Sequence, residues 1–377
     1  MELTKENIPQ YFREHQSDID FFDYNTDIDS VEIGDGNLNF VYRVYDTTRP
    51  DYSLVLKQAP PYIKILGPDY PLPPERLTFE YQALMTYNEF ASETVPKLYF
   101  FDVDSAVIIM EDLQGYRLLR DDLIRGQVNT SIPVEIGRFL GIIHSQTYFE
   151  NLDIRAIKQY KLDFKNTVMQ SITSDYVFTF PFTEHETNFY SDGLKEEVDQ
   201  LKTDKLFIQQ THALKRKFLN VQQGLTHGDL HTGSIMVRDQ STKVIDSEFA
   251  FFGPVGFDVG LFWANYLLSY YSHSGNIDVQ SKIKSCVVET WDSYIEEFKI
   301  EQHIKDVTLR NIFHEAVGFT GMEMLRRIIG AAHVKDIEGI TDKQRKLEIE
   351  IAILKFGKKI VKEHHNISSA KELVELL

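Results

Sequence analysis

Apolar and polar positions in the first third of the chain predict a small sheet with one helix. Short apolar runs at 53–57 and 105–110 have the length of buried strands. Apolar runs also flank a Gly-Asp-Gly-Asn segment at 34–37, and because Gly and Asn tolerate positive φ, this segment predicts a hairpin turn. Between these strands a helix is expected to begin near Glu75, with an apolar stripe formed by Leu77, Tyr81, Leu84 and Met85.

The second part of the chain follows a helical pattern. A buried strand runs out into a short acidic turn, where we place a boundary between two lobes, 1–112 and 113–377. Apolar residues at 133–149 fall on one helical face, and the chain from 257 to 377 reads as a succession of helices. Its most apolar part, 259–271, is too short to span a bilayer and suits a buried helix.

A second hairpin is predicted in the middle of the chain. Apolar runs at 234–237 and 243–245 flank turn-forming residues at 239–242. With the turn centred halfway along this segment, Ile235 lies opposite Asp246.

Three carboxylates are expected to meet at the mouth of this hairpin. Asp229 lies in the loop before its first strand, and Asp246 and Glu248 follow its second strand, with glycines nearby. Carboxylates are the hard oxygen ligands that Mg²⁺ prefers, and glycine lets backbone N–H groups approach a phosphate. We therefore interpret this region as a site for a divalent metal ion and a phosphate.

Lys57 and Glu80 are each unusual where they stand. Lys57 ends an apolar run, and Glu80 falls on the apolar stripe of the predicted helix. A buried carboxylate needs a partner, and a lone lysine in a strand is otherwise an edge residue whose stem covers apolar surface. We predict that the two side chains form an ion pair.

The composition narrows the functional classes. Hydrophobic residues at 42% and charged residues at 26% are ordinary for a globular protein, and the net charge of −17 argues against nucleic acid or an anionic membrane surface as partners. The single cysteine, Cys286, excludes an intrachain disulfide, and the N-terminal segment has no apolar run typical of a signal peptide. We expect a cytoplasmic protein that binds neither nucleic acid nor membrane.

Several segments together carry a resemblance to a known family. The sequence HGD followed by a hairpin, with Lys57 and Glu80 upstream, resembles the aminoglycoside-phosphotransferase branch of the protein-kinase-like fold. The longer segments HGDLHTGS, DSEFAFFGPVGFDVG and GMEMLRRIIGAAHV resemble methylthioribose kinases, and DGNLNFVYRV, VLKQAPPYIK and MEDL precede them in the expected order. The resemblance implies an α+β, protein-kinase-like two-lobe fold, with a small antiparallel β-sheet N-lobe containing one helix, a larger, mainly helical C-lobe, and ATP in the cleft.

The resemblance also implies a reaction and the residues that perform it. The γ-phosphate of ATP would pass, with Mg²⁺ bound, to the anomeric hydroxyl of 5-methylthioribose, a step of methionine salvage. The nucleotide and its metal would be bound by Asn37, Asn39, Lys57, Glu80, Glu111, Asp112, Leu113, Asp246, Ser247 and Glu248. The sugar would be bound by Asp229, His231, Arg326 and Arg327. Asp229 would be the catalytic base, Asp246 and Glu248 would be the magnesium ligands, and the chain would form a homodimer.

Two features depart from the wider fold. Ser234 stands where most relatives place an asparagine five residues after the catalytic aspartate, and it lacks an amide oxygen. After the hairpin the chain has Asp246-Ser247-Glu248, where the wider fold tends to have Asp-x-Gly or Asp-x-Asp, and methylthioribose kinases usually have proline at the middle position. We infer that Glu248 takes over the missing metal contact.

Two adjacent arginines, Arg326 and Arg327, lie in the segment that distinguishes the narrower family. They belong to a predicted helix at 322–334 and flank its apolar stripe on different sides, because neighbouring helix positions diverge by about 100°. We predict that at least one of them donates a hydrogen bond to the sugar or to the transferring phosphoryl group. In the alternative, Arg327 forms a surface ion pair with Glu323.

Other assignments stay open at this level. A second interpretation is another small-molecule kinase of the same fold, acting on choline, homoserine or an aminoglycoside, although the two arginines argue against a cationic substrate. A third is a non-catalytic nucleotide-binding regulator, which would have little use for the full set of ionisable residues. His231 faces either the substrate or solvent, and Asp258 either caps the following helix or braces the loop that carries Asp229.

Overall fold

The computed structural model describes residues 2–34 and 36–377, which form two compact units. The first unit runs to Tyr116 and takes up the later segment Lys243–Phe249, and the second contains Arg117–Thr242 and Ala250–Leu377. Nothing in the sequence pattern signalled the return of Lys243–Phe249 to the first unit. Asp35, part of the predicted turn at 34–37, lies outside the described residues.

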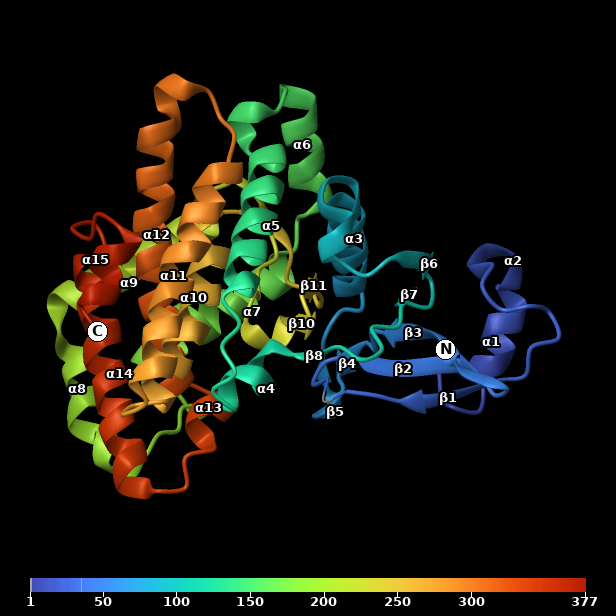
Figure 1. The fold of residues 1–377 in the computed structure, drawn as a ribbon, viewed down its shortest axis with the longest axis horizontal. Coiled ribbons are helices and arrows are strands. Elements are labelled where there is room, and N and C mark those ends of the chain that lie inside the picture. Colours follow the sequence, from blue (N-terminus) through green and yellow to red (C-terminus); the bar gives the residue numbers. More distant parts are fainter. Residues whose placement is uncertain (1, 35) are drawn as a thin grey trace. The chain divides into compact units, whose positions relative to one another are not determined.

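A five-stranded antiparallel sheet with the strand order β1-β2-β3-β7-β6 forms the first unit (Figure 1). Its strands are β1 (Ile28–Glu32), β2 (Phe40–Asp46), β3 (Arg49–Gln58), β6 (Leu98–Asp102) and β7 (Val107–Glu111), and a separate pair consists of β4 (Tyr62–Ile63) and β5 (Gly67–Pro71). The predicted strands at 53–57 and 105–110 correspond to β3 and β7, which pair with each other inside the sheet. The first predicted hairpin is also confirmed, because β1 and β2 are antiparallel neighbours.

Helices and the N-terminal segment cover both faces of this sheet. The helices are α1 (Ile8–Glu14), α2 (Gln16–Ile19) and α3 (Arg76–Ala91). One apolar cluster packs Ile8 of α1 with Leu54, and the other packs Leu77 of α3 with Ile108. Residues of β3 and β7 alternate between the two clusters because successive strand side chains point to opposite faces. The predicted α3 stripe is wrong at one position, since Met85 is 49% exposed.

The second unit contains short strands around the predicted central hairpin. These are β8 (Arg117–Leu118), β9 (Gly224–Thr226), β10 (Ile235–Arg238), the first two residues of β11 (Ser241–Val244) and β12 (Phe251–Gly253), in the orders β11-β10-β8 and β12-β9. Asp239 and Gln240 connect β10 to β11, and Asp239 has a φ of 54°, a conformation that aspartate tolerates. The turn therefore falls one residue earlier than predicted. Because β11 ends at Val244, the predicted pairing of Ile235 with Asp246 is wrong.

The rest of the second unit is helical (Figure 1). Its helices are α4 (Leu119–Ile124), α5 (Ser131–Thr147), α6 (Ile154–Asp163), α7 (Thr167–Phe178), α8 (Lys195–Thr203), α9 (Lys205–Asn220), α10 (Gly256–Ser272), α11 (Ile277–Glu297), α12 (Gln302–Ile329), α13 (Lys335–Glu338), α14 (Lys343–Glu363) and α15 (Ala370–Glu375). The predicted buried helix is α10, in which every residue from 256 to 270 is buried against neighbouring helices that include α11 and α12. Across the described residues, no helix combines the length and the apolar character needed to cross a membrane.

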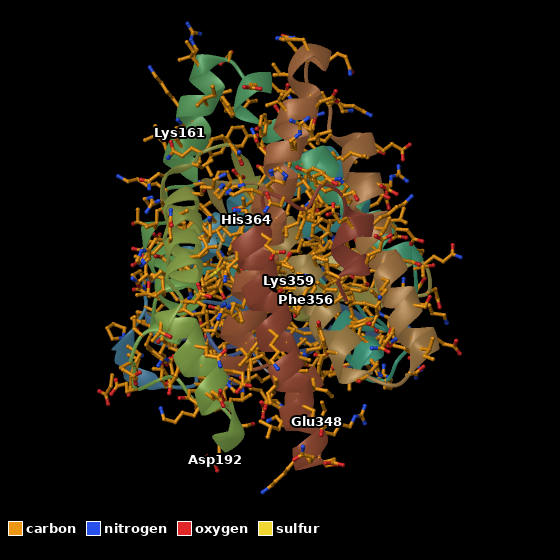
Figure 2. The ribbon with its side chains drawn as sticks, turned by 90° about the vertical axis from the view of Figure 1, so that its left-hand side faces the viewer. Lys161, Asp192, Glu348, Phe356, Lys359 and His364 are labelled. Carbon is orange, nitrogen blue, oxygen red and sulfur yellow. The ribbon has the colours of Figure 1, made fainter. Side chains whose placement is uncertain are left out.

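The long C-terminal helix α14 packs against α12 and α9 with one face only. Figure 2 marks Phe356 and His364 along and just beyond α14, and both are buried. Glu348 and Lys359, marked on the same helix, are exposed. Such a distribution is typical of a helix that covers a core from outside.

Helices α10 and α12 approach each other closely at Gly260. A Cβ added at this glycine would lie 2.7 Å from the Cβ of Phe319 and 2.8 Å from the carbonyl oxygen of Ala316. Real Cβ atoms do not come this near to backbone, so α12 must shift to admit even a methyl group.

We expect Gly260→Ala to lower the free energy of unfolding by about 1–3 kcal/mol, the usual cost of overpacking a core. Urea denaturation followed by circular dichroism measures this quantity. Gly339→Ala serves as the control, because its added Cβ would meet only the Lys335 carbonyl oxygen at 3.0 Å. Equal stability of the two variants would contradict the close helix contact.

Candidate active site

The loop from His227 to Ser234 joins β9 to β10 and is held by a carboxylate of α10. Asp258 is completely buried, and its oxygens accept hydrogen bonds from the backbone N–H groups of His227 (2.7 Å) and Gly228 (3.0 Å). The helix cap is Val255, so the capping alternative for Asp258 is wrong and the bracing alternative is confirmed. Its place in the first turn of α10 also stabilises the negative charge.

Three residues of this loop determine the position of Asp229. The backbone N–H of Asp229 donates to His227 Nδ1 at 3.2 Å, and Ser234 Oγ donates to the Asp229 carbonyl at 3.1 Å. His231 Nε2 lies 3.6 Å from the Asp229 carboxylate, while its Nδ1 accepts the N–H of Gly233 at 3.0 Å. The His231 ring is therefore turned towards Asp229 rather than to solvent.

The two arginines lie beside a buried carboxylate of their own helix and are themselves mostly, but not fully, buried. Helix α12 begins well before the predicted segment at 322–334 and ends earlier, because Gly330 adopts an extended conformation. The side chain of Glu323 is 0% exposed, and it accepts hydrogen bonds from both Arg326 and Arg327, each 11% exposed. The alternative pair of Arg327 with Glu323 is therefore confirmed, but it is wrong as a surface pair, because Glu323 is buried and also pairs with Arg326.

Asp229 acts electrostatically on both arginines within the second unit. Burial by itself lowers the pKa of Arg327, but the carboxylates of Glu323 and Asp229 outweigh this effect and raise it. The second unit thus gathers a loop carboxylate, a histidine and two charged guanidinium groups. Asp246 and Glu248 belong to the first unit, so their convergence with Asp229 stays a prediction.

Lys57 occupies the central strand of the first unit and is buried. Its Nζ lies 2.6 Å from Glu80 Oε2 and 2.5 Å from Asp246 Oδ1, so the predicted ion pair is confirmed and the edge-residue alternative is wrong. Burial favours the neutral amine, but Asp246, Glu80 and Glu248 outweigh it and raise the pKa of Lys57. A buried amine that keeps its charge is suited to binding an anion.

Arg76 is the residue of this region that sequence reasoning missed. Its Nη2 donates to Asn39 Oδ1 at 2.9 Å, its Nε lies 3.2 Å from Glu248 Oε2, and Asn39 Nδ2 donates to that same oxygen at 2.9 Å. Its other hydrogen bonds go to the carbonyl groups of Leu38, Pro60, Leu72 and Pro73. The available signal was its place one helical turn before Glu80, on the buried face of α3.

The remaining predicted nucleotide residues of the first unit lie in β7, in the turn that follows it and in two other segments. Glu111 ends β7, and a turn follows in which the N–H of Tyr116 donates to the carbonyl of Leu113 at 3.1 Å. The Asp112 carboxylate accepts hydrogen bonds from Arg43 and Ser53, both at 2.6 Å. The Asn37 carbonyl accepts the N–H of Ile65 at 3.1 Å, and Ser247 is buried with no hydrogen-bond partner for its hydroxyl among the described residues.

Asp246 and Glu248 fit a divalent cation by charge and donor type. Three carboxylates, Asp246, Glu80 and Glu248, surround two cations, Lys57 and Arg76. Burial and the repulsion between the carboxylates raise the pKa of Glu80 to about 7 and also raise the pKa of Glu248, so a bound cation would favour their charged forms. Mg²⁺ takes oxygen ligands and is commonly held by one or two carboxylates together with water and phosphate. The Asp246 side chain is 47% exposed, which leaves it accessible to such an ion.

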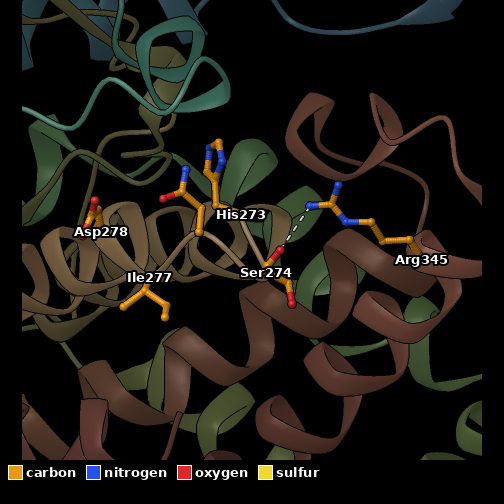
Figure 3. Close-up of a pocket in the computed structure, with 7 residues that line it drawn as sticks. His273, Ser274, Ile277, Asp278 and Arg345 are labelled. Carbon is orange, nitrogen blue, oxygen red and sulfur yellow. Dashed lines mark hydrogen bonds between the residues drawn. The ribbon is translucent and has the colours of Figure 1, made fainter.

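A surface pocket elsewhere in the second unit contains none of the predicted residues (Figure 3). It is lined by the segment 273–278 and by Arg345, whose guanidinium donates to the carbonyl groups of Ser272 (3.1 Å) and Ser274 (3.3 Å). These bonds join α10 to α14 and explain the arginine structurally. Within the described residues no group of three or more His, Cys, Asp or Glu side chains is arranged to hold a metal ion.

The chain matches the phosphotransferase enzyme family over residues 29–273. The solved structure of choline kinase from Cryptosporidium parvum Iowa II has a TM-score of 0.52 with this chain at 14% sequence identity, covering 94% of this chain and 95% of that one. At a sequence identity of 14%, this similarity shows only that the two proteins share a fold. The class is therefore a kinase-like phosphotransferase, and the predicted α+β fold with an antiparallel N-lobe sheet and a mainly helical C-lobe is confirmed.

Two curated relatives are methylthioribose kinases. The protein from Geobacillus sp. (strain WCH70) is 38% identical over 368 residues, covering 94% of this chain and 91% of that protein. The protein from Bacillus velezensis is 38% identical over 355 residues, covering 91% of this chain and 89% of that protein. The chain belongs to the methylthioribose kinase family. Membership of a kinase family implies ATP as phosphoryl donor, a divalent metal ion and a small-molecule acceptor.

Proposed function

We propose that this protein transfers the γ-phosphoryl group of ATP to the anomeric C1 hydroxyl of 5-methylthioribose, giving 5-methylthioribose 1-phosphate in methionine salvage. The observation that carries the proposal is the pair Arg326 and Arg327, each 11% exposed and interacting electrostatically with Asp229, in a chain of this family. Guanidinium groups do not titrate, so they offer fixed donors to sugar hydroxyls or to a phosphoryl group.

We assign nucleotide binding to the lobe at 1–112 together with Asp246-Ser247-Glu248. Lys57, oriented by Glu80, binds the α- and β-phosphates, as its retained charge supports. Asn37 and Asn39 lie over the phosphates, and the backbone of Glu111, Asp112 and Leu113 holds the adenine edge. Asp246 and Glu248 would hold Mg²⁺, which would supply positive charge to offset that of the phosphates.

We assign acceptor binding and base catalysis to the lobe at 113–377. Asp229 accepts the proton of the C1 hydroxyl while the hydroxyl oxygen bonds to the γ-phosphorus. The bond between the γ-phosphorus and the bridging oxygen breaks, and ADP leaves. His231 and the two arginines orient the sugar for this attack, which is consistent with the position of the His231 ring beside Asp229. By resemblance to its family, the protein further acts in the cytoplasm as a homodimer.

A coupled ADP-release assay with methylthioribose, ribose, choline, homoserine and kanamycin tests the function, and methylthioribose should support the fastest release. Asp229→Asn should lose about 10²- to 10⁴-fold in kcat, the usual contribution of a general base, while ATP affinity stays unchanged. Preference for choline, homoserine or kanamycin would contradict the substrate assignment. A near-native rate of the Asn variant would place the base elsewhere.

Glu248→Gln should raise the Mg²⁺ concentration for half-maximal activity by about 10- to 100-fold, the range typical of a weakened metal site. Ser234→Ala should change it far less, because the Ser234 hydroxyl donates to the Asp229 backbone. Isothermal titration calorimetry of Mg²⁺-dependent ATP binding checks, without catalysis, that Glu248→Gln has the larger effect of the two. Equal effects of the two substitutions would overturn the ligand assignment.

Arg326→Ala or Arg327→Ala should cost roughly 10- to 150-fold in kcat/KM for methylthioribose, because a hydrogen bond to a charged group contributes about 1.5–3 kcal/mol. The KM for ATP should change little, since the residues assigned to the nucleotide lie in the other unit. Steady-state kinetics with each substrate varied in turn measures both constants. Full activity of both variants with an unchanged KM for the sugar would remove the support for the narrow substrate.

A further inference from the structure

Glu323 links the two arginines through three hydrogen bonds. Its Oε2 accepts Arg326 Nε at 2.5 Å, and its Oε1 accepts Arg326 Nη2 at 3.0 Å and Arg327 Nε at 2.7 Å. The arginines follow it by three and four residues, the two helical spacings that place a side chain next to that of Glu323. One carboxylate between them can therefore hold both guanidinium planes at once.

The bonding pattern leaves particular N–H groups for a ligand. Arg326 uses Nε and Nη2 on Glu323, and Arg327 uses Nε on Glu323 and Nη1 on the Ala332 carbonyl at 3.3 Å. Among the described residues, Nη1 of Arg326 and Nη2 of Arg327 have no hydrogen bond. Because a guanidinium is rigid and planar, fixing its other nitrogens also fixes the directions of these remaining donors.

The electrostatics make Glu323 necessary for this arrangement. Two adjacent guanidinium groups repel each other, and Arg327 opposes the charge on Arg326. Burial alone would raise the pKa of Glu323, but the two arginines outweigh it and lower the pKa to about 2. Glu323 is thus ionised in the folded protein and offsets one of the two positive charges, while Asp229 acts on both.

We propose that Glu323 is a positioning residue for phosphoryl transfer, which sets the directions in which Arg326 and Arg327 present their remaining donors to the sugar or the transferring group. This inference rests on the proposed function of the two arginines. Glu323 is completely buried and acts through them, without contact to the reacting atoms.

Glu323→Gln tests the proposal, with Glu315→Gln as the matched control. Glu315 lies on the same helix, is also buried, and pairs with Lys217 at 2.7 Å rather than with an arginine. A glutamine at 323 keeps the volume but replaces one acceptor oxygen by a donor, so Arg326 loses at least one of its two hydrogen bonds and its guanidinium group should reorient. We expect kcat/KM for methylthioribose to fall about 10- to 100-fold, as displacements near 1 Å do, with the KM for ATP unchanged. Glu315→Gln should keep the wild-type kcat/KM for methylthioribose even if its melting temperature falls as much as that of Glu323→Gln.

The outcomes separate this proposal from the proposed function. If the arginine-to-alanine variants lose sugar kinetics and Glu323→Gln behaves like Glu315→Gln, the positioning role is wrong while the function stands. If the arginine variants themselves keep full sugar kinetics, the arginine role fails and the positioning role with it.

A second variant covers the case in which Glu323→Gln does not fold. Glu323→Gln combined with Arg327→Gln removes one charge of each sign, so the net charge of this group of side chains stays the same. Its kcat/KM for methylthioribose should fall further than that of Arg327→Gln alone, because Arg326 can keep only one of its two hydrogen bonds to residue 323. Equal values for the double and the single variant would overturn the proposal.

Discussion

The Asp258 carboxylate is the interaction on which the candidate catalytic loop depends. It is fully buried in the first turn of α10, accepts two backbone N–H groups from the residues just before Asp229, and lies 3.4 Å from His144 Nε2. An isolated carboxylate in this position would cost several kcal/mol, so these partners and the helix terminus must stay in place. Gly228, with a φ of 81°, lets the chain turn over this carboxylate. The backbone at Asp229 is thereby fixed by the most buried helix of its unit.

Buried carboxylates also hold the functional groups elsewhere, where their partners are cations rather than backbone N–H groups. Glu80 holds Lys57, Glu248 lies against Arg76, and Glu323 holds both arginines of α12. In each case the cation stays charged in a position shielded from water, where a hydrogen bond to an anion or a sugar hydroxyl is stronger than in water. Removal of the carboxylate would leave a buried charge without a partner, which is why we expect such changes to alter both stability and chemistry.

Sequence patterns predicted the parts of the molecule that follow from local periodicity. β3, β7, α5 and α10 were expected close to their observed bounds, because strand and helix periodicities are visible within one element. His144 of α5 is buried, and its ring nitrogens lie 3.2 Å from Tyr294 Oη and 3.4 Å from Asp258 Oδ2. The predictions were wrong at the hairpin turn, at Met85 and at the end of α12. The backbone conformation of one residue decides where the turn and the helix end lie, and the packing of neighbouring elements decides whether Met85 is covered.

The sequence by itself determined the family, the inventory of ionisable groups and the Lys57–Glu80 pair, because two misplaced charges on neighbouring elements have few alternative partners. Only the tertiary structure decided that Arg76 joins Asn39 to Glu248, that Asp258 braces the loop, and that Glu323 is buried and shared by two arginines. The reason is physical. The role of a carboxylate or guanidinium depends on how deeply it is buried and on partners that are often far along the chain. The spacing of the neighbouring residues encodes neither of these.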